Sequence, residues 1–192
     1  MLKKTVAGLL IAMMLLSFAG CGKDLDDKNN PAGSSPAPSL ALQPDMQDGQ
    51  FLVTSESFRS EYNALIDSNI YAPMAAFTSV PVEGFTSHTA NLTKDIFVWI
   101  MQRNGSTYID SVTLVCTSKE RVAQSELGAY TATLIKWCDP AYASAGTPGL
   151  FEGLKMGSQI VGTSETFIYN NILYSFRVEE DESIFSIQPA LQ

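Results

Sequence analysis

The sequence of 192 residues has few of the side chains that most often carry metal, redox or anion chemistry. It contains three cysteines and one histidine, and its 12 basic residues face 20 acidic ones, for a formal net charge of -8. A chain with this excess of acid is repelled by nucleic acid and by anionic lipid surfaces. It also lacks Cys-x-x-Cys and His-x-x-x-His pairs, calcium-loop spacing and glycine-rich phosphate loops. The sequence therefore predicts no metal site, no cofactor and no nucleic-acid partner.

Evidence for a nucleophilic or acid–base active site is also scarce. His88, the single histidine, lies in the polar segment 86–89 and is expected to face solvent. A Ser-His-Asp site would have to use His88, but no Gly-x-Ser-x-Gly elbow is present, and the segment from Gly157 to Gly162 lacks that spacing. On these patterns no catalytic residue is assigned.

Carboxylates offer a second route to catalysis, because glycoside cleavage uses two acids that flank a cleft. Asp110 and Glu165 are the only acidic residues away from the ends of the predicted strands, and both are expected to face outward on a solvated sheet. The acidic run from Glu179 to Glu182 has the composition of a soluble hairpin tip, although it could attract calcium. These acids leave a hydrolase open only as an alternative.

Beyond the N-terminal segment the sequence has no long apolar run. The longest candidates there, such as 96–101, are no longer than a strand and too short for a membrane-spanning helix. At the N-terminus, Lys3 and Lys4 precede a short apolar run at 9–16, and Phe18-Ala19-Gly20-Cys21 follows. This is the layout of a secretory signal, except that it ends on a thiol. The segment resembles the lipobox of bacterial lipoproteins, in which the cysteine is acylated and becomes the mature N-terminus.

The resemblance implies that residues 1–20 are a signal peptide and that Cys21 is lipidated. The protein is then exported and attached through its acyl chains to the bacterial membrane, with its domain on the extracytoplasmic side. Loss of Lys3 and Lys4 with the signal makes the formal charge of the mature chain about -10. Gly22, in place of an aspartate, resembles lipoproteins sent to an outer membrane where one exists.

Residues 21–50 are predicted to form the lipidated cysteine and a disordered tether. The stretch from Gly22 is charged and polar, and a segment rich in proline, serine and alanine follows from Pro31. It contains too little apolar surface to offset the entropy of ordering it. The globular domain is therefore expected to span residues 51–192.

Within that domain the patterns predict an α+β fold, in which an antiparallel sheet of about six to seven strands packs two main helices and one short helix against one face. The element order would also suit two halves, each a helix followed by a meander. Helices are expected after a cap at Thr54 or Ser55, over 119–138, and between a cap at Thr147 and Gly157, which follows the end of the short helix. Strands are expected at 77–80, 85–92, 95–102, 107–116, 159–168, 172–179 and 183–188, with a type I′ turn at Asn104-Gly105 and a loose stretch at 141–146.

Cys116 and Cys138 remain after lipidation of Cys21. The compartment allows a disulfide, but the helix predicted between these two cysteines would hold them roughly 22 Å apart. A disulfide needs Cα atoms within about 7 Å. We therefore predict two free, buried thiols.

The leading hypothesis is a non-enzymatic, lipid-anchored extracytoplasmic domain that binds a protein or peptide partner or serves the cell envelope. The alternative is a small cell-wall-acting hydrolase that uses carboxylates or His88. Aromatic residues could line a groove in either case, but their spacing favours a place in the core for most of them: Tyr62, Trp99, Tyr130, Trp137, Tyr174 and Phe176.

Overall fold

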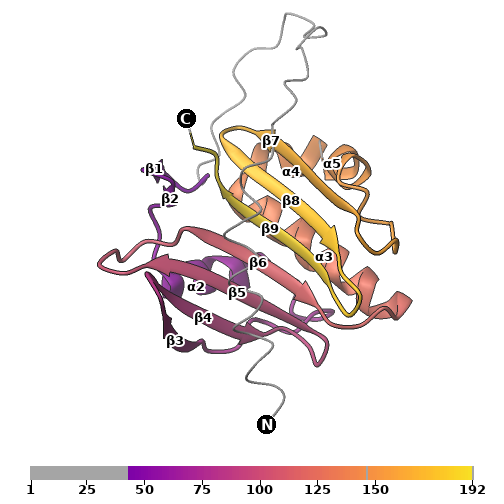
Figure 1. Cartoon of the computed structure of the whole chain (residues 1–192), viewed down its shortest axis with the longest axis horizontal. Coiled ribbons are helices and arrows are strands. Elements are labelled where there is room, and N and C mark those ends of the chain that lie inside the picture. Colours follow the sequence, from indigo (N-terminus) through magenta and orange to yellow (C-terminus); the bar gives the residue numbers. More distant parts are fainter. Residues whose placement is uncertain (1–42, 146, 192) are drawn as a thin grey trace, which may run out of the picture. The chain divides into compact units, whose positions relative to one another are not determined.

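The computed structural model describes residues 43–145 and 147–191, and these form one α+β domain (Figure 1). The described chain contains four helices, a seven-stranded antiparallel sheet and a two-stranded hairpin, so the predicted fold class is confirmed. No helix in the described ranges is long and apolar enough to cross a membrane. In chain order the elements are β1 (Met46–Gln47), β2 (Gln50–Phe51), α2 (Ser55–Leu65), β3 (Thr78–Val82), β4 (Phe85–Asn91), β5 (Ile96–Arg103), β6 (Ser111–Cys116), α3 (Arg121–Cys138), α4 (Pro140–Ala145), α5 (Thr147–Gly153), β7 (Ser164–Tyr169), β8 (Ile172–Val178) and β9 (Ser183–Pro189).

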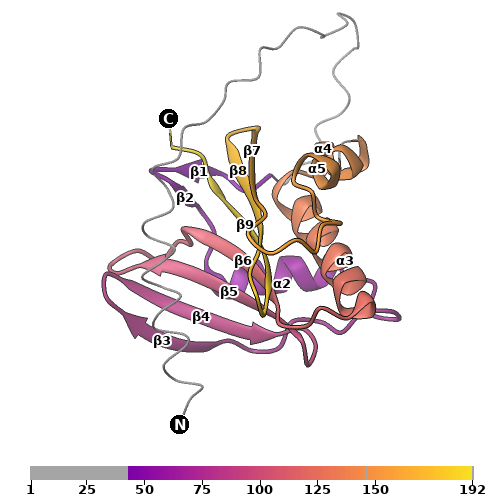
Figure 2. The same cartoon turned by 45° about the vertical axis from the view of Figure 1, so that its right-hand side comes forward.

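The large sheet consists of two meanders joined by their last strands. Its strand order is β3-β4-β5-β6-β9-β8-β7, and every neighbouring pair is antiparallel. Helix α2 precedes the first meander and helices α3 to α5 precede the second, which is the element order expected for two halves. Figure 2 shows β7, β8 and β9 nearly edge-on while β3 to β6 still show their faces, so the two meanders are turned relative to each other.

The helices lie on one face of this sheet (Figures 1 and 2). Helix α2 begins where its cap was expected, because Thr54 Oγ1 accepts a hydrogen bond of 3.1 Å from the Ser57 N–H. Along α3 the apolar residues that recur at helical spacing are all buried: Ala123, Leu127, Tyr130, Leu134 and Trp137. Phe58 of α2 packs edge-to-face on Trp137 of α3, with ring centroids 4.7 Å apart. The apolar stripes thus bury both long helices against the sheet.

The stretch at 141–146 was expected to be loose, but most of it belongs to α4. Asp139 caps this helix, since its Oδ1 accepts a hydrogen bond of 3.0 Å from the Tyr142 N–H. Pro140 occupies the first helical position, where a missing N–H costs nothing. The Asp-Pro pair therefore ends α3 and starts α4 at the same point. The predicted short third helix is present as α5.

The hairpin between β5 and β6 differs from the predicted type I′ turn. Gly105 has a positive φ of 84°, whereas Asn104 is not among the residues with positive φ in the described chain. The connection is longer than two residues, because Ile109 leaves the β5 ladder and pairs with Phe51 instead. Asp110 therefore precedes β6 rather than lying within the strand, and Thr113 of β6 is buried at 4% exposure.

Ordered structure begins before residue 51. Asp48 and Gly49 have φ angles of 52° and 73° and turn the chain between β1 and β2. Gln50 and Phe51 are buried, at 8% and 0% exposure, so residues 46–50 belong to the domain rather than to a disordered tether. The rest of the tether expected at 21–50, and the signal peptide, lie outside the described residues apart from 43–45.

Candidate functional site

His88 lies on the helix-covered side of the sheet and is only 9% exposed, so the expectation that it faces solvent was wrong. In the register of the β3–β4 hairpin it stands opposite Ser79, and the Ser79 Oγ lies 2.8 Å from the His88 Nδ1. On the other side, the His88 Nε2 lies 2.9 Å from the Gln102 Oε1. The Phe77 ring stands edge-on to the imidazole at a centroid distance of 6.0 Å. Three adjacent strands thus place a hydroxyl, an imidazole and an amide in a row.

Gln102 is itself held by the loop that follows β5. Its Nε2 donates a hydrogen bond to the backbone carbonyl of Ser106. The Ser106 hydroxyl in turn donates to the Gln50 Oε1 at 3.0 Å. Gln50 lies in β2, so the small hairpin β1–β2 supports the loop that orients Gln102. The row of polar side chains at His88 is therefore fixed at its Gln102 end by this loop and hairpin.

The two strand carboxylates considered for hydrolysis do not form a pair. Asp110 accepts hydrogen bonds of 2.6 Å from the Arg103 backbone N–H and from its Nε. Glu165 lies on β7, and its carboxylate forms a salt bridge with the Lys155 ammonium group. Strands β9 and β8 separate β6 from β7, which places the two acids roughly 14 Å apart across the sheet at about 4.8 Å per strand. Paired glycosidase carboxylates lie within about 5–10 Å, so the structure gives no support to this pairing.

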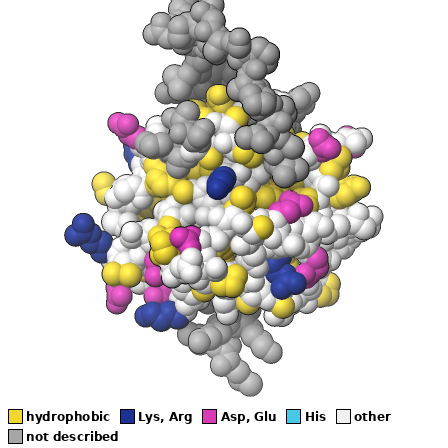
Figure 3. Space-filling model, turned by 180° about the vertical axis from the view of Figure 1, so that it is seen from behind, with side chains coloured by type: hydrophobic (Ala, Val, Ile, Leu, Met, Phe, Trp, Pro, Cys, Tyr) yellow, Lys and Arg dark blue, Asp and Glu magenta, His cyan; other side chains and the backbone are white. Residues whose placement is uncertain are grey.

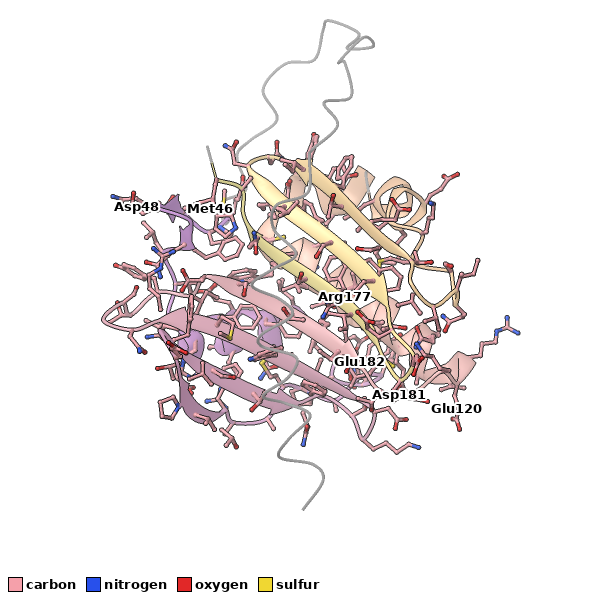
Figure 4. All side chains as sticks on the ribbon, in the orientation of Figure 1. Met46, Asp48, Glu120, Arg177, Asp181 and Glu182 are labelled. Carbon is pink, nitrogen blue, oxygen red and sulfur yellow. The ribbon has the colours of Figure 1, made fainter. Side chains whose placement is uncertain are left out.

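The acidic run forms the tip between β8 and β9, as expected of a hairpin. Lys119 Nζ donates to the backbone carbonyls of Glu179 and Glu182 at 2.8 and 2.9 Å. Desolvation by burial raises the pKa of the Glu182 carboxyl, and the neighbouring acids add to this effect. No group of three potential metal-ligating side chains occurs in the described part of the chain. Figure 4 shows Arg177, Asp181, Glu182 and Glu120 near this tip, at the opposite end of the sheet from Met46 and Asp48.

Cys116 and Cys138 are free and fully buried, which confirms the prediction of two buried thiols. Burial raises the pKa of the Cys138 thiol to about 12, and its Sγ lies 3.7 Å from the Tyr174 hydroxyl oxygen. Burial also raises the pKa of Cys116. A thiol with a raised pKa is a poor nucleophile at neutral pH, so both cysteines serve as apolar core residues. Cys21 lies outside the described residues.

The open face, defined here as the side of the seven-stranded sheet away from α2 and α3, carries a distinct set of side chains along β5. Four residues of this strand, Ile96, Val98, Ile100 and Gln102, face the helix side, and alternation turns the other four outward: Phe97, Trp99, Met101 and Arg103. The Trp99 indole N–H donates a hydrogen bond of 2.6 Å to the Ser87 Oγ, which fixes the ring. The remaining candidate aromatics, from Tyr62 to Phe176, are buried in the core.

A pocket of about 820 Å³ opens where β1–β2 meets the β7–β8 turn and the C-terminal residues. Its wall includes Asp45, Asp48, Asn170, Asn171 and Leu191, whereas His88, Asp110 and Glu165 do not line it. Asn170 and Asn171 adopt φ angles of 49° and 60°, so two-residue turns with two positive φ values lie here and at Asp48-Gly49 rather than at Asn104-Gly105.

Comparison with known proteins adds no precedent for these features. No family model matches the chain, and no curated protein or solved structure matches it significantly. Ser79 and Gln102, which flank His88, were not identified from the sequence. The available signal was the Glu83-Gly84 turn, because a two-residue turn there sets Ser79 opposite His88.

Proposed function

We propose that this protein is a lipid-anchored extracytoplasmic module that binds a protein partner through the open face of its sheet. The anchor is the cysteine at position 21, whose sequence context resembles a lipobox. The observation that carries the binding function is the outward row of β5, namely Phe97, Trp99, Met101 and Arg103. Aromatic residues, methionine and arginine are the types enriched in the cores of protein interfaces.

The exposure of these four side chains suits a prepared contact surface. Trp99 is 9% exposed, and its hydrogen bond to Ser87 fixes the ring, so it forms the rigid centre of this surface. Phe97 and Met101 are half-buried on either side of it, and the Arg103 side chain is 45% exposed. A surface already fixed in this way loses little side-chain entropy on binding.

Charge favours a polypeptide over a membrane or nucleic-acid surface as the occupant. The two arginines that point to this side are already paired, Arg103 with Asp110 and Arg177 with Glu179. The chain as a whole is acidic, which disfavours anionic lipid and nucleic acid. On the helix side, Figure 3 shows acidic and basic side chains spread singly among apolar ones, without one dominant charged patch.

Site-specific photo-crosslinking in native membranes tests this proposal. A photoreactive phenylalanine analogue replaces Phe97 in one variant and Val122 in a control. Val122 lies on α3 and is 68% exposed. The proposal expects a discrete crosslinked protein from position 97, lost when Met101→Asp is added, and no such product from position 122. Equal products from both positions, or products insensitive to Met101→Asp, would contradict it.

A further inference from the structure

We propose that Ser79 is a nucleophile activated by His88 and oriented through Gln102, and that it cleaves small carboxylic esters. This inference is independent of partner binding on the open face. It rests on three side chains from neighbouring strands, β3, β4 and β5, joined by hydrogen bonds of 2.8 and 2.9 Å. The same contacts determine which ring nitrogen carries the proton when the imidazole is neutral.

The deduction starts at Ser106. Its backbone carbonyl can only accept a hydrogen bond, so the Gln102 Nε2 must be the atom that faces it. The Gln102 Oε1 then faces the His88 Nε2, which must carry the proton and donate it. In the neutral imidazole this leaves a lone pair on the His88 Nδ1, to which the Ser79 hydroxyl can donate. Such an arrangement is the one a general base needs to remove the hydroxyl proton.

Access and charge stabilisation are provided by the edge of the sheet. Strand β3 is a terminal strand of the sheet, and Ser79 is exposed whereas His88 is not. Pro81, two residues further along β3, has no N–H, and a proline in an edge strand turns its nitrogen away from the partner strand. Ser79 lies two residues before Pro81 in the same strand, so its backbone nitrogen points the same way. Its N–H is therefore directed to the open edge of the sheet at β3. There it can stabilise the oxyanion that develops on the carbonyl oxygen of an ester when its carbon bonds to the adjacent Oγ.

The reaction has two balanced stages. In the first, the Ser79 Oγ bonds to the ester carbonyl carbon, its proton passes to the His88 Nδ1, and the ester C–O bond breaks as the alkoxide leaves with that proton. In the second, water attacks the acyl-serine, gives a proton to His88 Nδ1, and the carboxylic acid leaves as the proton returns to the Ser79 oxygen. Gln102 is neutral and stabilises the imidazolium less than a carboxylate would, so esters are favoured over amides.

Covalent labelling of the full chain with a fluorophosphonate provides the test. In the labelling step, an O–P bond forms at Ser79, the P–F bond breaks, and His88 receives the proton. We expect a single adduct that peptide mass spectrometry maps to Ser79, together with slow hydrolysis of 4-nitrophenyl acetate. Ser79→Ala should abolish both, whereas Ser60→Ala should change neither, because Ser60 is an exposed serine on α2 without a histidine partner.

The other two residues have separate readouts. His88→Gln should slow labelling about 100-fold or more, which is typical for loss of a general base. Gln102→Glu should move the pH midpoint of labelling upward, because a carboxylate at His88 Nε2 favours the protonated imidazole. A purely structural role for Gln102 would change the melting temperature but not this midpoint.

The proposal is overturned if Ser79 carries no adduct, or if the folded His88→Gln variant is labelled as fast as the unmodified chain. Should His88→Gln fail to fold, an unmoved pH midpoint in Gln102→Glu would overturn the proposal on its own.

Discussion

The Tyr62 hydroxyl donates a hydrogen bond of 2.9 Å to the backbone carbonyl of Tyr130, which joins α2 to α3 inside the core. Both rings are at least 99% buried, and burial raises the pKa of the Tyr62 hydroxyl well above its ordinary value. The hydroxyl therefore remains neutral and a donor across the physiological pH range. This contact connects the helices of the two meanders across 68 residues of sequence.

Tyr62→Phe removes this bond and keeps the ring. We expect the free energy of unfolding to fall by about 1 kcal/mol, since a typical buried hydrogen bond contributes that much. Urea denaturation of the full chain checks the value. Tyr108→Phe is the matched control, because its side chain is 39% exposed, and it should leave the midpoint unchanged. Equal effects from the two variants would show that the Tyr62 hydroxyl contributes nothing.

Phe51 should be required for stability although it directly follows the segment expected to be a tether. Its side chain is fully buried and packs on Trp137 at a ring-centroid distance of 5.4 Å, and its backbone pairs with Ile109. Phe51→Ala should cost about 3–5 kcal/mol, as other buried phenylalanines do. Gln47→Ala, an exposed position in β1, should cost little. A loss below 0.5 kcal/mol on Phe51→Ala would mean that the hairpin does not pack on the domain.

The elements that sequence patterns predicted well are those determined by neighbours along the chain. Helix α2 needed only the cap at Thr54 and the spacing of Phe58 and Tyr62. Strand β8 followed from the alternation of buried and half-buried residues between Ile172 and Val178. In both cases the period of the apolar residues contains the information.

The features that were missed depend on contacts between distant segments. β2 is too short to show alternation; it pairs with β1, and its Phe51 also pairs with the distant Ile109. That pairing also prevents the two-residue turn expected at Asn104-Gly105. His88 was expected at the surface because its neighbours in sequence are polar, but its burial depends on Ser79 and Gln102 from the strands on either side. Strand alternation alone does not show which face is covered.

Stability should decline at high pH through the buried thiol of Cys138. Its pKa rises from 9.0 to about 12 in the folded protein because of burial. The unfolded thiol loses its proton first, so stability is complete below pH 9 and is lost between pH 9 and about 12. One such group contributes a slope of at most about 1.4 kcal/mol per pH unit.

The cleanest window is pH 9 to 10, below the ordinary pKa of tyrosine. Cys138→Ala should make the fall of unfolding free energy with pH shallower there, whatever its effect on stability at neutral pH. Val122→Ala, at an exposed helix position, should keep the original slope. If the unfolding free energies of Cys138→Ala and of the unmodified chain fall equally steeply with pH, burial does not raise the pKa of this thiol.

Anchoring should depend on Cys21. Cys21→Ser should leave unprocessed precursor and abolish lipid labelling, because serine provides no thiol for acylation. Intact-mass measurement of the membrane fraction checks this, with Ser17→Ala as a control that keeps the cysteine. A mature chain that begins at another residue and carries no acyl mass would contradict the anchor.

The most direct test of the proposed function is the affinity of the protein captured from position 97, once purified, for the soluble domain. Calorimetric titration compares the unmodified domain with Phe97→Ala and with Val122→Ala. A central interface aromatic contributes about 2 kcal/mol or more, so we predict that Phe97→Ala weakens binding at least about 30-fold while Val122→Ala leaves the Kd unchanged. A Kd for Phe97→Ala within twofold of the unmodified domain would contradict binding through the open face.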